Sequence, residues 1–276
     1  MTALAVTHST ASDGTFSAPG ATAWDASHTL SGVLAAAQFP ALTGAVTTAE
    51  GSLATAVGTI AGRLIVRTVY TSGTAATHTL NSQTTMAWVR ARAGGGSGAS
   101  SNTTGANGGV GGGGSQGGYV DKLYTGLTGG GTLTYTVGAG GTAPSAGAND
   151  GNAGNDTTVT DGTTLITAKA GLGGKSMAAG SSAVGVAGGA SPAVSTNGDL
   201  NQSGDQGGIG LRFNTTTMFS GGGGGDGGGA ALVAEAAGVA GVSYGSGGGG
   251  AMSVSGGSAR AGGAGASGFV GIWEFS

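Results

Sequence analysis

Glycine accounts for 66 of the 276 residues of this chain, and 58 of these glycines lie from Gly94 onwards. Ordering a glycine in a helix or strand costs roughly 0.5–1 kcal/mol more than ordering an alanine, which over 58 residues amounts to a cost on the order of tens of kcal/mol. Side chains cannot offset this cost, because glycine has none. An ordered structure must therefore rely on the backbone, in which every glycine still carries one N–H donor and one C=O acceptor.

The glycine runs lack the strict Gly-X-Y period of collagen, and the chain has only 4 prolines. The runs lie at 111–114, 129–131, 221–225, 227–229 and 247–250. Segments without Cβ atoms can approach each other closely, and polyproline-II-like helices make no internal hydrogen bonds, so their amides are free to bond neighbouring segments. We therefore expect a sandwich of glycine-rich polyproline-II-like helices joined by backbone hydrogen bonds. The alternative is that the runs are flexible linkers.

Apolar clusters between the runs predict short β-strands that close this sandwich. The hydrophobic share of the chain is 38%, and the predicted strands are 64–70, 86–92, 133–137, 164–168 and 269–275. Alternation over 86–92 places Met86, Trp88 and Arg90 on one face. We expect four aromatic residues to form the core at the base of the sandwich: Trp88, Tyr135, Phe269 and Trp273. The predicted fold class is mainly β and irregular.

The first 62 residues differ in composition from the rest of the chain. They are rich in Ala, Thr and Ser, and their only strongly ionising side chains are Asp13, Asp25 and Glu50. A piece of this size with so few large side chains would be marginally stable alone. We expect residues 1–62 to be a small region that buries surface against copies of itself or a partner, and residues 63–276 to be a separate glycine-rich domain.

Charge and cysteine content exclude several functions. The formal net charge is −3 and charged residues make up only 8%, which gives no electrostatic reason to bind nucleic acid. Cysteine is absent, which excludes disulfides and thiol chemistry. No apolar run reaches the roughly 18 residues of a membrane span, and the first eight residues lack the pattern of a secretory signal. We expect no cofactor and no metal site.

Glycine-based catalytic motifs arise by chance in such a chain. Gly109–Gly114 matches GxGxxG but lies in no βαβ unit, and Gly113–Gly117 matches GxSxG although all three histidines precede it. Gly221–Asp226 matches a calcium-repeat motif in a single copy. Two groups of carboxylates could supply a glycosidase pair, but such Asn/Asp/Gly-rich stretches are typical of turns: Asp150, Asp156 and Asp161 form one group, and Asp199 and Asp205 the other. We expect no enzymatic activity.

Surface recognition must then come from the inserts between glycine runs. These inserts are 97–107, 143–156, 176–206, 212–219, 230–244 and 252–260. Aromatic and arginine side chains dominate binding hot spots, so the candidate contact residues are Arg212, Phe213, Phe219, Tyr244 and Arg260. The alternative for Phe213 and Phe219 is that they pack beneath the lattice.

Two stretches resemble proteins of tailed bacteriophages. Residues 30–53, which begin Leu-Ser-Gly-Val-Leu and continue through Phe39-Pro40-Ala41-Leu42-Thr43-Gly44, are similar to a segment that recurs in tail-fibre proteins; Gln38 and Ala45 stand where that pattern has Arg and Asp. Residues 64–276, with the ending 262–275, resemble the glycine-rich domain of phage tail-fibre and adhesin proteins.

The resemblance implies a virion-attached, homotrimeric tail fibre or fibre tip. Residues 1–62 would be a small extended fibre or attachment region that binds other tail or virion proteins. Residues 63–276 would be the glycine-rich distal domain, whose loops would bind a host cell-surface receptor, either an outer-membrane protein or a glycan. The alternative is a purely structural virion component, such as a head fibre, collar or baseplate decoration.

Overall fold

The computed structural model describes residues 6–7, 29–30, 46–48, 55–57 and 61–276, and the chain divides into two units, Met1–Ile60 and Ala61–Ser276. In the first unit β1 (Val6–Thr7) pairs with β2 (Thr29–Leu30), and β3 (Val46–Thr48) pairs with β4 (Thr55–Val57), both antiparallel. The rest of the predicted attachment region lies outside the described residues.

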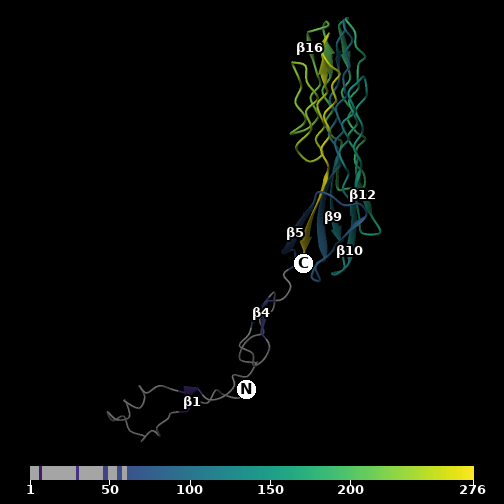
Figure 1. Ribbon diagram of the computed structural model, residues 1–276. Coiled ribbons are helices and arrows are strands. Elements are labelled where there is room, and N and C mark those ends of the chain that lie inside the picture. The colour runs from purple at the N-terminus through teal and green to yellow at the C-terminus, as the bar shows by residue number, and fades with distance from the viewer. Residues whose placement is uncertain (1–5, 8–28, 31–45, 49–54, 58–60) are drawn as a thin grey trace, which may run out of the picture. The chain divides into compact units, whose positions relative to one another are not determined.

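The second unit consists of short strands joined by long irregular segments (Figure 1). Its strands are β5 (Leu64–Tyr70), β6 (Ala76–Thr79), β7 (Met86–Arg92), β8 (Gly109–Val110), β9 (Tyr119–Thr125), β10 (Thr132–Thr136), β11 (Thr157–Thr160), β12 (Leu165–Ala168), β13 (Val184–Val186), β14 (Leu200–Gln202), β15 (Gly210–Arg212), β16 (Met218–Phe219), β17 (Met252–Ser253) and β18 (Phe269–Phe275). No helix occurs among the described residues, so this part of the chain has none that could span a bilayer. The predicted mainly β and irregular fold class is confirmed.

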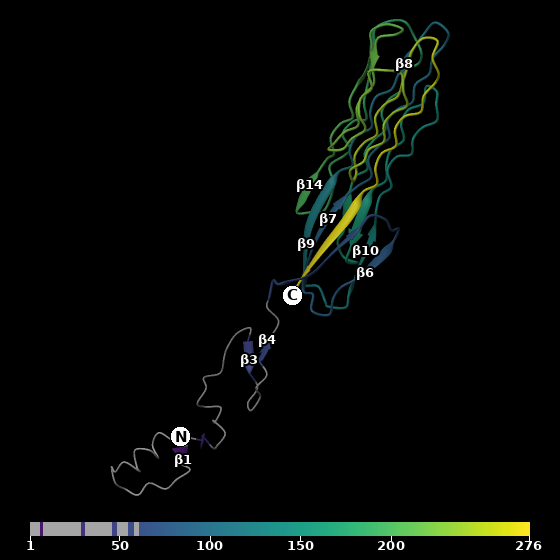
Figure 2. The ribbon, with the colours of Figure 1, turned by 60° about the vertical axis from the view of Figure 1, so that its left-hand side comes forward.

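Two antiparallel sheets form the base of this unit. One has the strand order β14-β9-β7-β18-β5 and the other the order β12-β11-β10-β6, and Figure 2 shows both at the end of the unit that holds the C-terminus. The main core lies between them and includes Val89, Val120, Leu133, Ile166 and Ile272. All five side chains are completely buried. Removing this apolar surface from water is the main hydrophobic contribution of the base.

The central strands β7 and β18 alternate between this core and the opposite face of the five-stranded sheet. Trp88 and Trp273 pair across the strands on that opposite face, with ring centroids 5.5 Å apart. The guanidinium of Arg90 lies 3.9 Å from the Trp88 ring centroid, a cation–π contact. The expectation that Trp88, Phe269 and Trp273 form the core is therefore wrong, and only Tyr135 is in it, because period-2 alternation gives the inner face to the small residues between them.

A buried polar network joins the edges of the two sheets. His78 Nε2 lies 2.9 Å from Glu274 Oε1, and the Tyr70 hydroxyl lies 2.7 Å from His78 Nδ1. The second carboxylate oxygen accepts hydrogen bonds from the Asn81 amide (2.7 Å) and the Thr84 hydroxyl (2.5 Å). His78 and Glu274 are 6% and 1% exposed. Because a buried carboxylate is tolerated only when its oxygens are satisfied, this network fixes β18 against β6.

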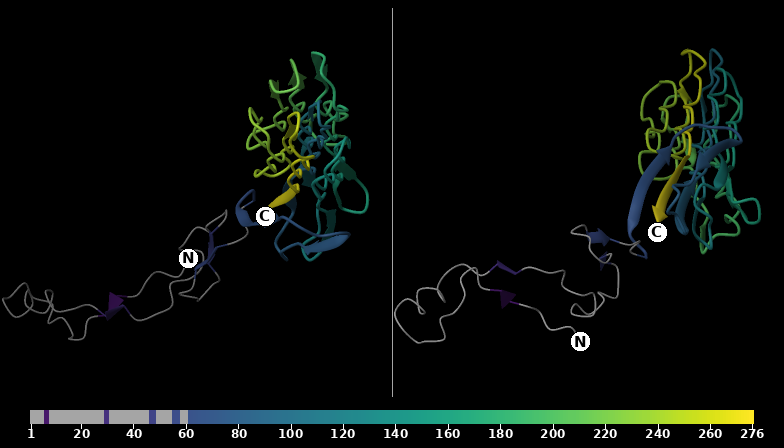
Figure 3. Two further views of the ribbon diagram at one scale, coloured as in Figure 1. Left: turned by 45° about the horizontal axis from the view of Figure 1, so that its top comes forward. Right: turned by 90° about the horizontal axis from the view of Figure 1, so that it is seen from below.

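Above the base, glycine-rich segments run side by side along the unit; Figure 3, left, views them obliquely from the end opposite the base. The Gly96 amide donates to the Ser115 carbonyl (2.9 Å), the Gly114 amide to Gly248 (2.8 Å), and the Gly248 amide back to Gly96 (2.9 Å). Three segments distant in sequence are thus joined in one closed set of backbone hydrogen bonds. We call this region, 93–118 with the glycine runs that bond to it, the lattice.

Close approach is what requires glycine in the lattice. A Cβ on Gly223 would lie 2.0 Å from the Gly247 carbonyl oxygen, although the φ of Gly223 lies outside the left-handed region. A Cβ on Gly98 would meet the Gly249 oxygen at the same distance. Both obstacles are backbone atoms, which cannot move aside as a side-chain tip can. The alternative that the runs are flexible linkers is therefore wrong.

We expect Gly223→Val to prevent folding of the second unit, because its side chain would overlap the Gly247 backbone and separate two hydrogen-bonded segments. Gly105→Val is the matched control, since a Cβ at Gly105 has no atom within 4 Å. Circular dichroism and the urea unfolding midpoint of both variants test this. A cooperative transition in Gly223→Val with an unchanged midpoint would contradict it.

We expect Glu274→Ala to destabilise the protein by about 3–5 kcal/mol, because it leaves His78, Thr84 and the Asn81 amide buried without their acceptor. Asp205→Ala, which removes an exposed carboxylate that accepts no hydrogen bond, is the control. The measurement is the free energy of unfolding in urea. A loss in Glu274→Ala no larger than that in the control would show that the network contributes nothing to stability.

Candidate functional site

The lattice brings several inserts together at the end opposite the two base sheets, near β16 in Figure 1 and β8 in Figure 2. Ser101 and Arg260 exchange backbone hydrogen bonds of 2.9 Å, and the Ser255 amide donates to Thr215 (3.0 Å). Gly108 pairs with Gly180. We call segments 102–107, 177–183, 213–217 and 254–259 the apical loops.

A three-stranded sheet with the order β13-β15-β16 supports these loops. Its inner face covers a small core in which Met218 packs with Val110 and Met252. Leu211 of β15 and Phe213, which directly follows that strand, alternate with the inward-facing Arg212, and Leu211 pairs with Phe219 of β16. The outer face therefore carries Leu211, Phe213 and Phe219, which we call the apical patch.

The two phenylalanines of the apical patch are exposed. Phe213 is 53% and Phe219 41% exposed, and their rings meet edge to face with centroids 6.0 Å apart. The alternative in which they pack beneath the lattice is therefore wrong. The loop between them is ordered by Asn214, whose side-chain oxygen accepts hydrogen bonds from the Thr216 and Thr217 amides (2.9 and 2.7 Å). Such an ordered aromatic pair is suited to binding, because little side-chain freedom is lost on contact.

Arg212 is not part of this exposed surface. It is 7% exposed, and its guanidinium donates to the carbonyls of Ser182, Gly108 and Ala178, each at 2.9 Å. Burial lowers its pKa, and Gly180 makes room for its side chain, since a Cβ there would lie 2.5 Å from Nη2. Arg212 thus joins two apical loops from within.

Arg260 lies at the apical end and is tied to an acidic partner. Its Nη2 is 2.9 Å from Glu235 Oε1, and the Ser258 amide donates to the same oxygen (3.0 Å). The pKa of Glu235 is lowered, first by that backbone hydrogen bond and then by Arg260. The pair holds the loop 254–259 in place and leaves the Arg260 side chain partly exposed.

Tyr244 lies at the other end of the lattice. It is 51% exposed, its ring is 5.5 Å from that of Phe269 on β18, and the following residue, Gly245, accepts a hydrogen bond from the Gly117 amide (2.8 Å). The structure therefore brings Phe213, Phe219 and Arg260 to the apical end and leaves Tyr244 beside the base. Sequence reasoning missed Leu211, although alternation along 211–213 would have placed it on the face of Phe213.

The motifs set aside in the sequence have structural positions. Ser115 of the GxSxG match is completely buried, and its hydroxyl accepts a hydrogen bond from the Leu172 amide (2.7 Å). Asp150 pairs with Lys175 and Asp156 with Lys169 (2.8 and 2.9 Å). Within the described residues, no group of three His, Asp or Glu side chains is arranged to hold a metal ion.

Comparison with known protein families identifies one that matches most of this chain. A search of curated proteins finds no match to the chain. The family model described as a glycine-rich domain matches residues 69–273, which is most of the chain and nearly all of the second unit. The lattice, the apical loops and the base sheets, apart from the outer ends of β5 and β18, fall within this match. The chain therefore belongs to the glycine-rich domain family.

Proposed function

We propose that this chain is a bacteriophage tail-fibre or fibre-tip protein that binds a host cell-surface receptor through the apical end of its glycine-rich domain. The observation that carries the proposal is the apical patch: two exposed, mutually packed phenylalanines on an ordered sheet, at the end where the apical loops converge. Aromatic residues are enriched in protein interfaces, so an exposed and ordered pair of phenylalanines is suited to recognition.

The other parts of the proposal come from the resemblance of residues 30–53 and 64–276 to phage fibre proteins. The N-terminal region attaches the protein to other tail or virion proteins, the assembly is a homotrimer, and the location is the virion. The apical end binds its receptor, an outer-membrane protein or a glycan, without cleaving it. The many backbone bonds of the lattice support this role, since they hold the loops rigidly while leaving their sequences free to differ.

The second candidate is a structural virion component, such as a head fibre, collar or baseplate decoration, that binds no receptor. The observation that favours it is the small extent of the apical patch, which a neighbouring virion protein could cover. The two candidates differ in whether the isolated protein competes with the phage for its host.

We expect purified full-length protein to block adsorption of its parent phage to host cells. The double variant Phe213→Ser/Phe219→Ser should require at least about tenfold more protein for the same block, because exposed aromatic anchors contribute about 2 kcal/mol or more each. Leu165→Ser is the control: it removes another exposed apolar side chain, 48% exposed on β12 at the base.

If the double variant blocked adsorption as well as the wild-type protein does, the apical patch would not be part of the receptor site. Failure of the folded wild-type protein to block adsorption would favour the structural candidate.

We expect the full-length protein to be a homotrimer in solution. Light scattering coupled to size exclusion tests this, and a monomeric mass at micromolar concentration would be the contrary result.

A further inference from the structure

A polar groove lies beside the lattice, next to β14 at the edge of the five-stranded sheet. Its volume is about 580 Å³. The lining comes from four separate stretches of the chain and contributes mainly polar side chains: Arg92, Gln116, Asn201, Gln202, Asp205 and Asp226.

The groove collects the carboxylates that the fold does not use. Residues 61–276 contain nine acidic side chains, and seven of them accept hydrogen bonds from other described residues: Asp121, Asp150, Asp156, Asp161, Asp199, Glu235 and Glu274. The other two, Asp205 and Asp226, form no hydrogen bond or ion pair with any described residue, and both line the groove. Their location suits contact with a ligand rather than support of a loop.

Arg92 supplies a cation to the lining of the groove. Its guanidinium makes no hydrogen bond or ion pair with the described residues. The guanidinium carbon lies 5.6 Å from the centroid of the Tyr119 ring, a cation–π contact. Its stem is held against Gly245, where a Cβ would lie 2.7 Å from both Cγ and Cδ. Burial lowers the pKa of Arg92, while Tyr119, Asp205 and Asp226 raise it. The guanidinium is thus fixed in place with its donors unused.

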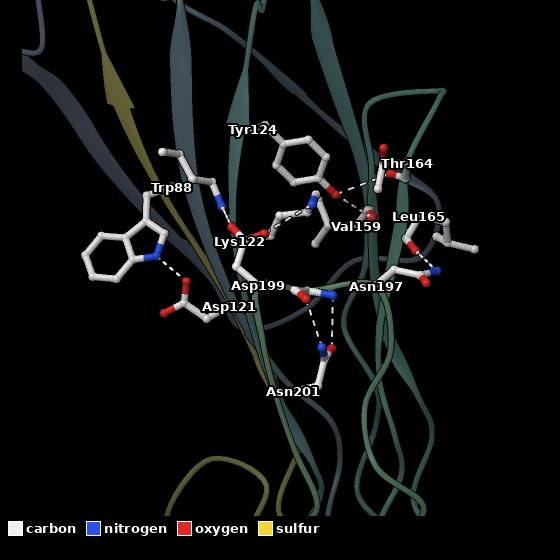
Figure 4. A network of polar contacts seen from close by, with 12 residues as sticks. Trp88, Asp121, Lys122, Tyr124, Val159, Thr164, Leu165, Asn197, Asp199 and Asn201 are labelled. Carbon is white, nitrogen blue, oxygen red and sulfur yellow. Dashed lines mark hydrogen bonds and ion pairs between the residues drawn. The ribbon is translucent and has the colours of Figure 1, made fainter.

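The wall formed by 195–205 is held firmly. Figure 4 shows Asp199 reaching β9, where its carboxylate accepts a hydrogen bond from the Leu123 amide (2.8 Å), and Asn197 donating to the Leu165 carbonyl (2.8 Å). The Gln116 amide donates to the Asp205 carbonyl (2.8 Å). The side chain of Gln116 fills the space left by Gly225, where a Cβ would lie 2.2 Å from Nε2. The backbone that forms the groove is therefore preorganised, which lowers the entropy cost of binding.

We propose that this groove binds a neutral saccharide. A guanidinium only donates hydrogen bonds, a carboxylate only accepts them, and an amide side chain does both. Adjacent sugar hydroxyls both donate and accept, so they can satisfy all three kinds of group at once. An anion would face two unpaired carboxylates and a metal cation would face the guanidinium, so a neutral ligand fits the charges better than either.

An aromatic ring lies beside these polar groups. Tyr119 is paired in register with Arg92 on one side and with Gln202 on the other, so its ring lies between the two groove residues on the same face of the sheet. The ring is not part of the groove lining and supports the Arg92 guanidinium, which lies 5.6 Å from its centroid. This site is separate from the apical patch, and its occupancy does not depend on the receptor role proposed above.

The test is saturation-transfer NMR of the full chain with neutral probes: glucose, galactose, mannose, rhamnose, N-acetylglucosamine and their disaccharides. We expect at least one to bind, and we expect Asp226→Asn and Gln202→Ala each to raise its Kd at least tenfold. Asp150→Asn is the matched control, with the same charge change on a carboxylate outside the groove. Phe213→Ser/Phe219→Ser should bind the sugar as the wild-type protein does.

Each of four results would overturn the proposal. One is that no probe in the panel binds. Another is binding that the two groove variants leave unchanged, since the sugar would then lie elsewhere. The third is a shift of the Asp205 and Asp226 amide signals on titration with Ca²⁺ alone at micromolar concentration, which would make the groove a cation site. Loss of sugar binding in the apical double variant would merge this site with the receptor site and would also contradict the proposal.

Discussion

The fold depends on hydrogen bonds between backbone segments that no side chain separates. In an ordinary sheet each strand bonds to neighbours on two sides, whereas Gly96, Gly114 and Gly248 form a closed set among three segments. Such closeness is possible only without Cβ atoms, because a Cβ on Gly98 or Gly223 would lie only 2.0 Å from a backbone oxygen of the neighbouring segment. The conformational cost of glycine is therefore offset by backbone hydrogen bonds between the segments of the lattice.

The lattice has few apolar side chains of its own. The base sheets supply the apolar core that holds the ends of its segments in place. β7, β9 and β18 continue directly into glycine segments at 93, 118 and 268, so the register of the sheet also sets the register of the lattice. At this junction the Ala93 amide donates a hydrogen bond to the Gly118 carbonyl (3.1 Å), and the Gly268 amide donates one to the Gly138 carbonyl (2.9 Å). The apolar core and the Glu274 network therefore hold in place segments that lie well above them.

Much of the fold was predictable because its longest strands have strong apolar patterns. The ranges 64–70, 86–92 and 269–275 agree with β5, β7 and β18. β6, β8, β9 and β11 were missed, and so were the short strands β13 to β17. Strands of two or three residues carry no periodic signal and their pairing comes from distant segments, whereas the seven-residue β9 has charged residues, Asp121 and Lys122, at its centre. The direction of Trp88 and Trp273 was mistaken for a different reason. Alternation assigns residues to two faces of a strand, but it does not say which face the second sheet covers.

The candidate site was predictable only where its residues are neighbours in sequence. Phe213 and Phe219 flank one loop, so their common location follows from the insert itself, whereas burial of Arg212 depends on carbonyls of Gly108, Ala178 and Ser182. The polar groove was even less predictable. Its residues Arg92, Gln116, Asp205 and Asp226 come from distant segments, which only the backbone hydrogen bonds of the lattice bring together. A scaffold joined by backbone alone can gather side chains from any segment without constraining their identity. Sites on this fold are therefore set by which segments the lattice places together, and single-segment motifs say little about them.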